Sequence, residues 1–535
     1  MLRRLRVPRL STVSCYRYLA LPSTSKEADA NDLNKTIADG VAHVTATNIY
    51  TNERSIVQLK LPKKPMSRKF RREYAIPDQA KSGLLDVLIA CDRSPKQLQH
   101  EADQLTEKLN QRRFPASTAV VREARNKVKA MLKEKHEGDV MNELLDEKIS
   151  SRINYKERHE VDKMLKKADF NWKPLMLDSQ EAAAAYALSR LAPNYAEIAR
   201  ALDEFEGHDF SPASVLDYGS GIGAAFWAVN ERFGPSVKEF CMVDPSPIVT
   251  QAAMDIMRDQ SGNLSRAMNF RRHLVPSLRT KYDLVIAHRI LCEIGSPESR
   301  LDLISSLWKR TNRFLVLIDS GKQDAFEALM EARDFLLMSG HRLHLEDTMA
   351  LLRDHNLLSD YITSVLHDKR VSDLERFAIV RDMVPPEIEL PTALQSATVY
   401  APCPHDLGCP MLGRSACTVP LRWRVIRADG KRSRYEQSGT ETGKMSFVIL
   451  EKGSRQGQDT VTRILKARQA HGHITCDVCT AFKGIQRLTV SRRAGVLYQR
   501  ARTRRDGELF PLEVKTVATE SMFDLYKDLD VDNQK

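Results

Sequence analysis

Short apolar runs alternate with helical stretches between residues 206 and 390. The runs that predict buried strands are Ser214–Tyr218, Glu239–Val243, Tyr282–Ala287 and Arg313–Ile318. The stretches that predict helices between them are Ala224–Phe233, Thr250–Gln260 and Arg300–Arg310. Strands that alternate with helices of about 10–15 residues are typical of a parallel, doubly wound sheet. We therefore predict an α/β fold for residues 206–390.

The pattern changes on both sides of this region. Residues 81–205 have apolar positions at helical spacing, and we predict an N-terminal helical region in which Pro193 separates two helices, Ala182–Arg190 and Asn194–Phe205. Residues 27–80 lack a clear period and include a dense basic run, Lys63–Arg72, so we predict an irregular basic segment that is either solvated or in contact with phosphate. Residues 391–515 combine five of the nine cysteines with many arginines and strand-like stretches, and residues 516–535 form a polar tail.

Composition narrows the class of protein. The chain has 535 residues, of which 42% are hydrophobic and 28% charged, so collagen-like and wholly disordered proteins are excluded. No run of about 18 apolar residues occurs, so no transmembrane helix is predicted. The 82 Lys and Arg outnumber the 70 Asp and Glu, and the resulting net charge of +12 permits a polyanionic partner such as RNA.

The first 26 residues have the composition of a targeting segment. They contain arginine, serine and threonine but no acidic residue, since the first acid is Glu27. This pattern is typical of a mitochondrial presequence, although a basic tail without a targeting role has the same composition. We predict that residues 1–26 are a presequence and that the protein resides in the mitochondrial matrix.

A glycine-rich loop follows the first predicted strand. Asp217, Gly219, Gly221 and Gly223 lie where a strand ends and a helix begins, so that backbone N–H groups can approach a ligand. Asp244 ends the second strand and can accept hydrogen bonds from ribose hydroxyls. The loop also fits a dinucleotide fingerprint. However, Asp217 two residues before the first glycine resembles motif I of class I methyltransferases, which bind S-adenosylmethionine.

The region after the third strand of the α/β region carries no methyl-transfer element. Enzymes that methylate an exocyclic amine usually have Asn/Asp-Pro-Pro-aromatic near this position, and this chain has Ala287–Glu293 instead. Cys292 lacks the context of a covalent nucleophile and is better interpreted as a buried thiol. We predict no catalytic residue, and binding is better supported than catalysis.

The cysteines near the C-terminus predict a metal site. Cys403, Cys409 and Cys417 are followed about 60 residues later by Cys476 and Cys479. Disulfides are disfavoured in reducing mitochondrial compartments. Only Cys476 and Cys479 have the short spacing of a zinc knuckle, whereas the prolines beside Cys403 and Cys409 suit a chain wrapped around an iron–sulfur cluster. Spacing alone leaves both metals open.

Together these motifs resemble the mitochondrial small-ribosomal-subunit methyltransferase-like assembly factors. The resemblance covers about residues 175–515. The stretches that carry it include Glu181–Tyr186, Val215–Gly221, Val243–Ser246, Tyr282–Val285, Cys403–Pro410, Gly472–Cys479 and Tyr498–Arg502.

The resemblance implies a class I methyltransferase fold with a C-terminal cluster-binding domain. It implies a pocket for S-adenosylmethionine and a [4Fe–4S] cluster on Cys403, Cys409, Cys417 and Cys476, with Cys479 as the competing fourth ligand. It further implies a factor without transferase activity that assembles the mitochondrial small subunit with its ribosomal RNA and ribosomal proteins. An active RNA methyltransferase of the same fold is the alternative. We expect the C-terminal arginines to contact phosphate, and Tyr498 and Phe510 to stack on unpaired bases.

Overall fold

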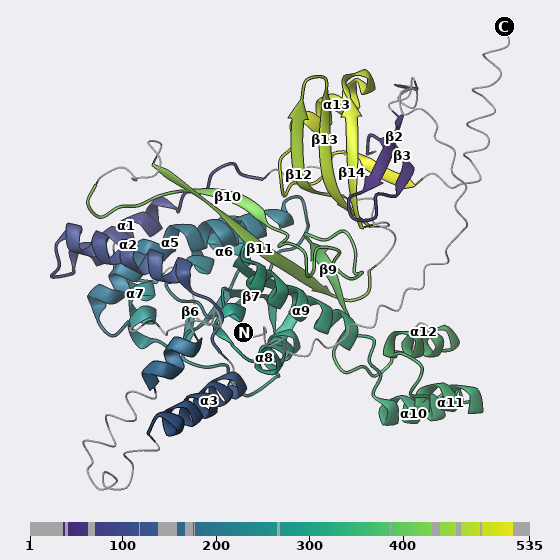
Figure 1. Cartoon of the computed structure of the whole chain (residues 1–535), viewed down its shortest axis with the longest axis horizontal. Coiled ribbons are helices and arrows are strands. Elements are labelled where there is room, and N and C mark those ends of the chain that lie inside the picture. Colours follow the sequence, from purple (N-terminus) through teal and green to yellow (C-terminus); the bar gives the residue numbers. More distant parts are fainter. Residues whose placement is uncertain are drawn as a thin grey trace.

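The computed structural model describes most of the chain between residues 36 and 516 (Figure 1). The described residues are 36–37, 41–62, 70–116, 118–136, 158–165, 175, 177–259, 261–264, 268–385, 387–430, 439–455, 462–481 and 484–516. The predicted presequence, residues 63–69 of the basic run and nearly all of the polar tail lie outside them. No helix in the described ranges is long and apolar enough to cross a lipid bilayer.

A mixed sheet occupies the centre of the molecule, with the strand order β10-β11-β8-β7-β4-β5-β6 (Figure 1). The strands β4 to β8 run parallel, and β11 is antiparallel to both β8 and β10. This order, with one reversed strand near its end, is that of class I methyltransferases, so the predicted α/β fold is confirmed. The strands are β4 (Ser214–Tyr218), β5 (Glu239–Val243), β6 (Met268–Arg271), β7 (Tyr282–His288), β8 (Thr311–Ser320), β10 (Val419–Arg424) and β11 (Thr440–Lys452), with β9 (Ala397–Ala401) paired to the end of β11.

Helices cover both faces of this sheet. Successive strand residues point to opposite faces, so Val215 joins one hydrophobic core and Leu216 the other. The first core lies under α1 (Asp78–Ile89), α2 (Pro95–Gln111), α5 (Gln180–Leu202), α6 (Ala224–Phe233) and α7 (Pro247–Met257). The second lies under α8 (Pro297–Arg310) and α9 (Gln323–Ser339). A further helix, α3 (Thr118–His136), precedes α5 in the chain.

Two details of the sequence prediction are corrected, one in the α/β region and one in the N-terminal helical region. Strand β6 was not predicted, because it is short and only partly buried and so gives little apolar signal. Pro193 does not separate two helices but lies inside α5. The apolar face of α5 is buried on both sides of Pro193, including Leu191 and Tyr195, and this packing outweighs the backbone hydrogen bond that proline cannot donate.

A second, antiparallel sheet contains the C-terminal strands in the order β12-β13-β14-β2-β3-β15. Its strands are β12 (Arg463–Ala470), β13 (His473–Thr480), β14 (Gly484–Ser491), β2 (Val41–Asn48), β3 (Arg54–Lys60) and β15 (Glu513–Thr516), and the short β1 (Thr36–Ile37) pairs with β2. Leu509, just before β15, pairs with Arg463 at the start of β12, so the two edges of the sheet meet. Helix α13 (Val496–Arg502) packs against it. We call this unit the C-terminal barrel.

The barrel corrects the prediction that residues 27–80 are irregular. Strands β2 and β3 come from this segment and lie beside the C-terminal strands (Figure 1). Ala42, Val44 and Ala46 alternate with more exposed residues, as do Val57 and Leu59. This alternation is the signal that could have revealed the strands.

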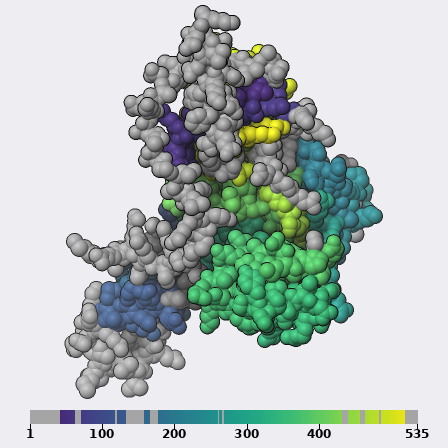
Figure 2. All heavy atoms as spheres, turned by 90° about the vertical axis from the view of Figure 1, so that its right-hand side faces the viewer, coloured from purple at the N-terminus to yellow at the C-terminus, as the bar shows by residue number. Residues whose placement is uncertain are grey.

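A small helical insertion follows α9 and projects from the central domain (Figure 1). It consists of α10 (Leu345–Asp354), α11 (Asp360–His367) and α12 (Asp373–Met383), which share a small core of their own. The insertion lies far from the barrel strands in both views (Figures 1 and 2).

Candidate functional site

The predicted glycine loop connects β4 to α6 at the carboxyl ends of the parallel strands. Gly219, Gly221 and Gly223 have φ of +73°, +50° and +77°. L-residues with a side chain rarely adopt this left-handed conformation, so the loop needs glycine at these positions. The turn lets the backbone reverse between strand and helix within a few residues.

The three glycines differ in what surrounds them. A Cβ on Gly223 would lie 1.9 Å from Cε of Met257, and one on Gly219 would lie 1.9 Å from Cδ1 of Ile290. A Cβ on Gly221 would find only the Tyr186 hydroxyl, at 3.9 Å. Gly223 is therefore required by core packing and does not line the adjoining cavity, whereas Gly221 faces open space.

A large cavity adjoins the loop. It has a volume of about 1220 Å³ and is lined by the glycine loop, the loops after β7 and β8, α5 and the end of α2. Lys322, which follows β8, donates to the carbonyl oxygens of Asn110 (2.7 Å) and Arg112 (2.8 Å) at the end of α2. Arg112 also pairs with Glu293 at 3.1 Å. The N-terminal helical region is thus tied across the site where doubly wound folds bind ligands.

Two carboxylates lie beside the loop. Asp244 accepts hydrogen bonds from the backbone N–H of Gly221 and of Ser246, both at 2.9 Å. Asp217 is 2% exposed and lines the cavity, and its Oδ2 has no hydrogen-bond partner within the described residues. Burial, together with the nearby Asp244 charge, raises the pKa of Asp217 to about 8. A buried polar atom without a partner is suited to a ligand that brings its own hydrogen-bonding group, and a cationic donor there would favour the ionised carboxylate.

The cavity also contains a buried cation. Arg190 of α5 donates to Asn194 at 2.8 Å, and burial, together with the nearby Arg289, lowers the pKa of Arg190 to about 10. The unpartnered oxygen of Asp217 and the guanidinium of Arg190 complement an ammonium and a carboxylate, the two groups of the methionine part of S-adenosylmethionine. The residues present therefore fit that cofactor chemically.

An internal ion pair lines the cavity at the carboxyl end of β7. Glu197 accepts from Arg289 at 2.8 and 2.5 Å and lies 2.7 Å from Nε2 of His288. Although burial opposes ionisation, Arg289 and His288 hold the pKa of Glu197 well below its usual range. Burial and the Asp319 charge raise the pKa of Cys292, so its thiol is poorly suited to nucleophilic attack.

Four cysteines gather between the sheet and the barrel. Cys403, Cys409 and Cys417 lie in the loop between β9 and β10, and Cys479 lies near the end of β13. Burial raises the pKa of Cys479, and the charges of the other three thiols raise it further. His405 adds a fifth donor, with its Nε2 3.3 Å from the Cys479 sulfur.

Cys476 lies apart from this group. It is three residues from Cys479 along β13, so the two side chains point to opposite faces of the strand. Cys476 is fully buried among apolar residues of the barrel, and burial raises its pKa to about 12 with no contribution from another cysteine. The structure thus brings Cys479 to the other three thiols and not Cys476, which the resemblance favoured.

The thiols do not form a ready coordination site as they stand. Within the residues that the structure describes, no three His, Cys, Asp or Glu side chains are placed to hold a metal ion. The donor set nevertheless fits a soft metal, because a bound cation would stabilise the thiolate forms that burial and mutual repulsion disfavour. No cysteine in these ranges forms a disulfide.

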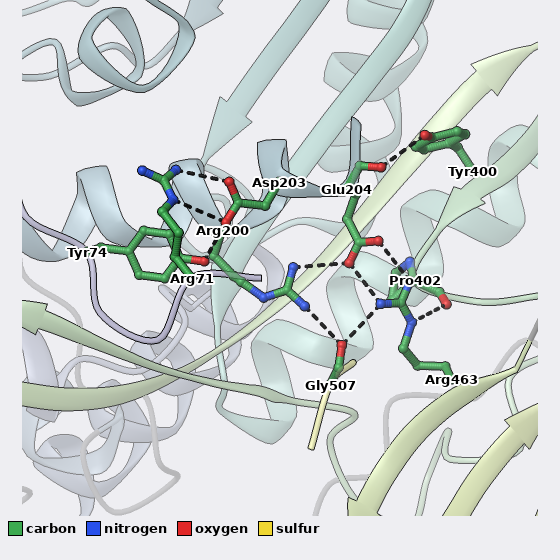
Figure 3. A network of polar contacts seen from close by, with 9 residues as sticks. All are labelled: Arg71, Tyr74, Arg200, Asp203, Glu204, Tyr400, Pro402, Arg463 and Gly507. Atoms are coloured by element: carbon green, nitrogen blue, oxygen red, sulfur yellow. Dashed lines mark hydrogen bonds and ion pairs between the residues drawn. The ribbon is translucent and has the colours of Figure 1, made fainter. Parts of the chain in front are cut away.

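A buried ionic network joins the cysteine loop, α5 and the barrel (Figure 3). Glu204 is fully buried and accepts from Arg463 of β12 at 2.9 and 3.0 Å and from Arg200 at 3.1 Å. Arg463 also donates to the carbonyl oxygen of Pro402, the residue before Cys403, at 3.1 Å. The network therefore fixes the barrel and the cysteine loop against the helix that lines the cavity.

The barrel exposes part of the basic surface that the sequence predicted. Arg492, Arg493, Arg500, Arg502 and Arg505 are exposed. Arg487 instead pairs with Asp477 at 2.7 Å, Arg504 lies 3.9 Å from Glu508, and Lys483 is outside the described residues.

The two predicted stacking residues differ. Tyr498 is partly exposed, with Arg502 5.8 Å from its ring centroid. The prediction that Phe510 stacks on bases is wrong, because this ring is fully buried in the barrel core.

Comparison with known proteins gives a family and several relatives. The family described as mitochondrial small ribosomal subunit Rsm22 matches residues 180–345 and 375–511, more than half of the chain. The human mitochondrial ribosome assembly protein METTL17 is 26% identical over 370 residues, which are 68% of this chain and 69% of that protein. The Rsm22-cox11 tandem protein 2 of Schizosaccharomyces pombe is 24% identical over 57% of this chain and 39% of its own length.

Solved methyltransferases overlap only loosely. The magnesium protoporphyrin IX methyltransferase of Synechocystis PCC 6803, with bound SAH, is 14% identical over 48% of this chain and 83% of its own, with a TM-score of 0.22. The assignment of the fold rests on the strand order and not on this overlap.

Proposed function

Because the chain belongs to the mitochondrial small ribosomal subunit Rsm22 family, we propose that it assists assembly of the mitochondrial small ribosomal subunit by binding ribosomal RNA. The observation that carries this proposal is the family match, which spans both the α/β domain and the barrel. The exposed arginines of the barrel support RNA as the ligand, since guanidinium groups bind phosphate in a bidentate manner. The same proposal places the protein in the mitochondrial matrix, with residues 1–26 as its presequence.

The cavity beside Gly221 is the proposed site for S-adenosylmethionine. When bound, this cofactor supplies an activated methyl group. The chain contributes the Gly221 backbone N–H, the Asp244 carboxylate and the unpartnered Asp217 oxygen. Arg289, which follows β7, is held in an ion pair with Glu197 and is not free to position a substrate. We therefore propose that the cofactor binds without methyl transfer.

An active RNA methyltransferase remains the second candidate, favoured by the size and polarity of the cavity. Mapping methylated nucleotides of the small-subunit ribosomal RNA in cells with and without the protein separates the two. A modification that disappears with an Asp244→Ala variant would establish the enzyme.

A [4Fe–4S] cluster on Cys403, Cys409, Cys417 and Cys479 is the proposed metal centre. Those ligands come from one loop and one barrel strand, so a cluster would join two parts of the chain and stabilise their association. Zinc is the competing metal, because it also binds four thiolates. Iron, sulfide and zinc analysis of the anaerobically purified protein decides between them.

The assembly role is tested in cells that lack the protein. We expect these cells to contain less mature mitochondrial small subunit on a sucrose gradient. The wild-type chain should restore the subunit, and so should the Asp244→Ala variant, because assembly does not need methyl transfer. A normal small subunit in the absence of the protein would refute the proposal.

A further inference from the structure

A second cavity lies where the barrel meets the central sheet. It has a volume of about 530 Å³, within the range of about 300–1,000 Å³ that is typical of ligand sites. Its walls come from four parts of the chain far apart in sequence: the segment Phe70–Arg72, the end of α5, the β10–β11 pair, and the turn Arg505–Glu508. We call it the junction pocket.

Cations dominate the junction pocket. Its lining includes Arg71, Arg72, Arg200, Arg422, Lys444 and Arg505, against Asp506 and Glu508. Three of these cations already take part in interactions, and Arg422 is one of them. Arg71 binds Asp203 at 3.0 Å and Glu231 at 2.8 Å, and Arg200 binds Glu204 at 3.1 Å.

Three of the cations remain available for a ligand. Arg72, Lys444 and Arg505 are exposed, and among the described residues no carboxylate lies within ion-pairing distance of their charged groups. They come from three of the four walls, so their charges surround one space. Such an arrangement concentrates positive potential inside a concave surface.

The two acids of the pocket are engaged elsewhere. Asp506 accepts from the backbone N–H of Ala467 at 2.8 Å. Glu508 accepts from the backbone N–H of Arg505 at 3.3 Å and lies 3.9 Å from the Arg504 guanidinium. These contacts hold the turn in shape and leave the pocket with a net positive lining.

We propose that the junction pocket binds a backbone phosphate of single-stranded RNA, an inference that rests on the proposed function and locates its RNA contact. The exposed Arg500 and Arg502 of α13 precede Arg505 in the chain, so a strand bound along the barrel arginines has a cationic site at its end. A flexible single strand can insert a phosphate into a concave site, whereas the backbone of a double helix is held in a fixed spiral. Phosphate contacts of this kind add affinity without sequence preference.

The test measures binding of the full-length protein to a fluorescent single-stranded RNA of about 12 nucleotides by anisotropy, across a salt series. The variant Arg72→Gln/Arg505→Gln removes two unpaired charges. We expect about tenfold weaker binding at about 0.1 M salt, and a decrease of about 1.4 in the slope of log affinity against log salt, because each single-strand phosphate contact contributes about 0.7. Lys444→Gln alone should give about half of the change in slope.

The matched control is Arg353→Gln/Lys369→Gln, which removes two exposed charges from the helical insertion. It should leave both affinity and slope unchanged, and thermal melts of all variants should coincide with the wild type. A duplex of the same sequence should bind equally to wild type and to the Arg72/Arg505 variant.

The outcomes separate the two proposals. If the wild type binds RNA and the Arg72/Arg505 variant binds equally well, the junction pocket is refuted and the proposed function stands. If the wild type binds no RNA, both are refuted. If the Arg72/Arg505 variant loses binding of inorganic phosphate but keeps the RNA affinity of the wild type, the pocket belongs to a free anion and the RNA assignment is overturned.

Discussion

At the scale of single residues, similar side chains have different tasks because their surroundings differ. Gly221 and Gly223 share one loop and one backbone conformation, yet one faces a cavity and the other a buried methionine. Cys476 and Cys479 share one strand, yet one lies in the apolar core of the barrel and the other beside three thiols. Spacing in the sequence identifies these residues as a group, but the direction of each side chain decides which environment it enters.

Asp217 gives a prediction about pH. Its ordinary pKa of 3.8 rises to about 8 in the folded protein, so between about pH 4 and pH 8 the folded state holds a proton that the unfolded state has lost. Stability from this group is therefore fully present below about pH 4 and falls as pH rises, by up to about 1.4 kcal/mol per pH unit. We expect Asp217→Asn to remove this dependence, so that the variant gains on the wild type in thermal melts at pH 8 relative to pH 5. Parallel melting profiles would contradict the raised pKa.

The two glycines give a second prediction. Alanine at Gly221 should lower the free energy of unfolding by about 1–2 kcal/mol, the cost of a left-handed backbone. Alanine at Gly223 should cost about 2–3 kcal/mol, because buried Met257 must also move. Denaturant titrations of the two variants check the order. An equal or reversed order would show that the loop is less closely packed than its contacts indicate.

At the scale of elements, α5 connects the parts of the molecule. It supplies Arg190 and Glu197 to the cavity. At its end, Arg200 donates to the Gly507 carbonyl of the barrel, and the nearby Glu204 accepts from Arg463 of β12. The cysteine loop reaches the same network through the Pro402 carbonyl. One helix thus sets the geometry of two candidate sites.

Glu204 gives the prediction for this connection. Glu204→Gln leaves two buried arginines beside a neutral acceptor, and we expect a loss of about 3–5 kcal/mol in stability. The control is Glu451→Gln, which breaks a surface pair with Arg313 (3.2 Å) and should cost no more than about 1 kcal/mol. Chemical denaturation of each variant measures the change in its free energy of unfolding. Equal effects would mean that the network contributes little.

Strand β13 gives the prediction for the metal centre. Cys479→Ser should lower the iron and sulfide content of the anaerobically purified protein to less than half, because it removes one of four ligands. Cys476→Ser should leave the metal content unchanged, since its thiol points into the barrel core. If Cys476→Ser loses the metal and Cys479→Ser retains it, the ligand assignment is reversed.

At the scale of the whole molecule, the two ends of the chain build one barrel. Strands β2 and β3 lie between β14 and β15, although more than 400 residues separate them in sequence. The N-terminal strands therefore close a surface whose arginines come mostly from the C-terminus. The barrel is complete only after the last strand has been made.

A shortened chain tests this arrangement. A variant that begins at Phe70 lacks β2 and β3, so β14 and β15 lose their partners and apolar residues such as Leu488 become exposed. We expect limited proteolysis to cleave residues 462–516 rapidly while the central sheet remains intact. A protease-resistant barrel in the shortened chain would show that the N-terminal strands are dispensable.

The sequence by itself determined the local elements of the α/β domain. The predicted bounds of β4, β5 and α6 agree with the structure. The short length of the two apolar runs and the turn residues beside them indicate strands, and the glycine loop marks where the helix begins. The glycine loop and the two carboxylates beside it were also predictable, since the left-handed turn and the strand ends follow from local sequence.

Tertiary structure decided what depends on distant partners. Proline within α5 was tolerated because packing on both sides of it outweighed one hydrogen bond, and the N-terminal strands were recognisable only beside the barrel strands they complete. The choice between Cys476 and Cys479 and the junction pocket required the direction of side chains from separate elements. Local pattern fixes the backbone of an element, but only the folded chain fixes which faces meet, because that choice minimises the exposed apolar area and the unpaired charge of all elements together.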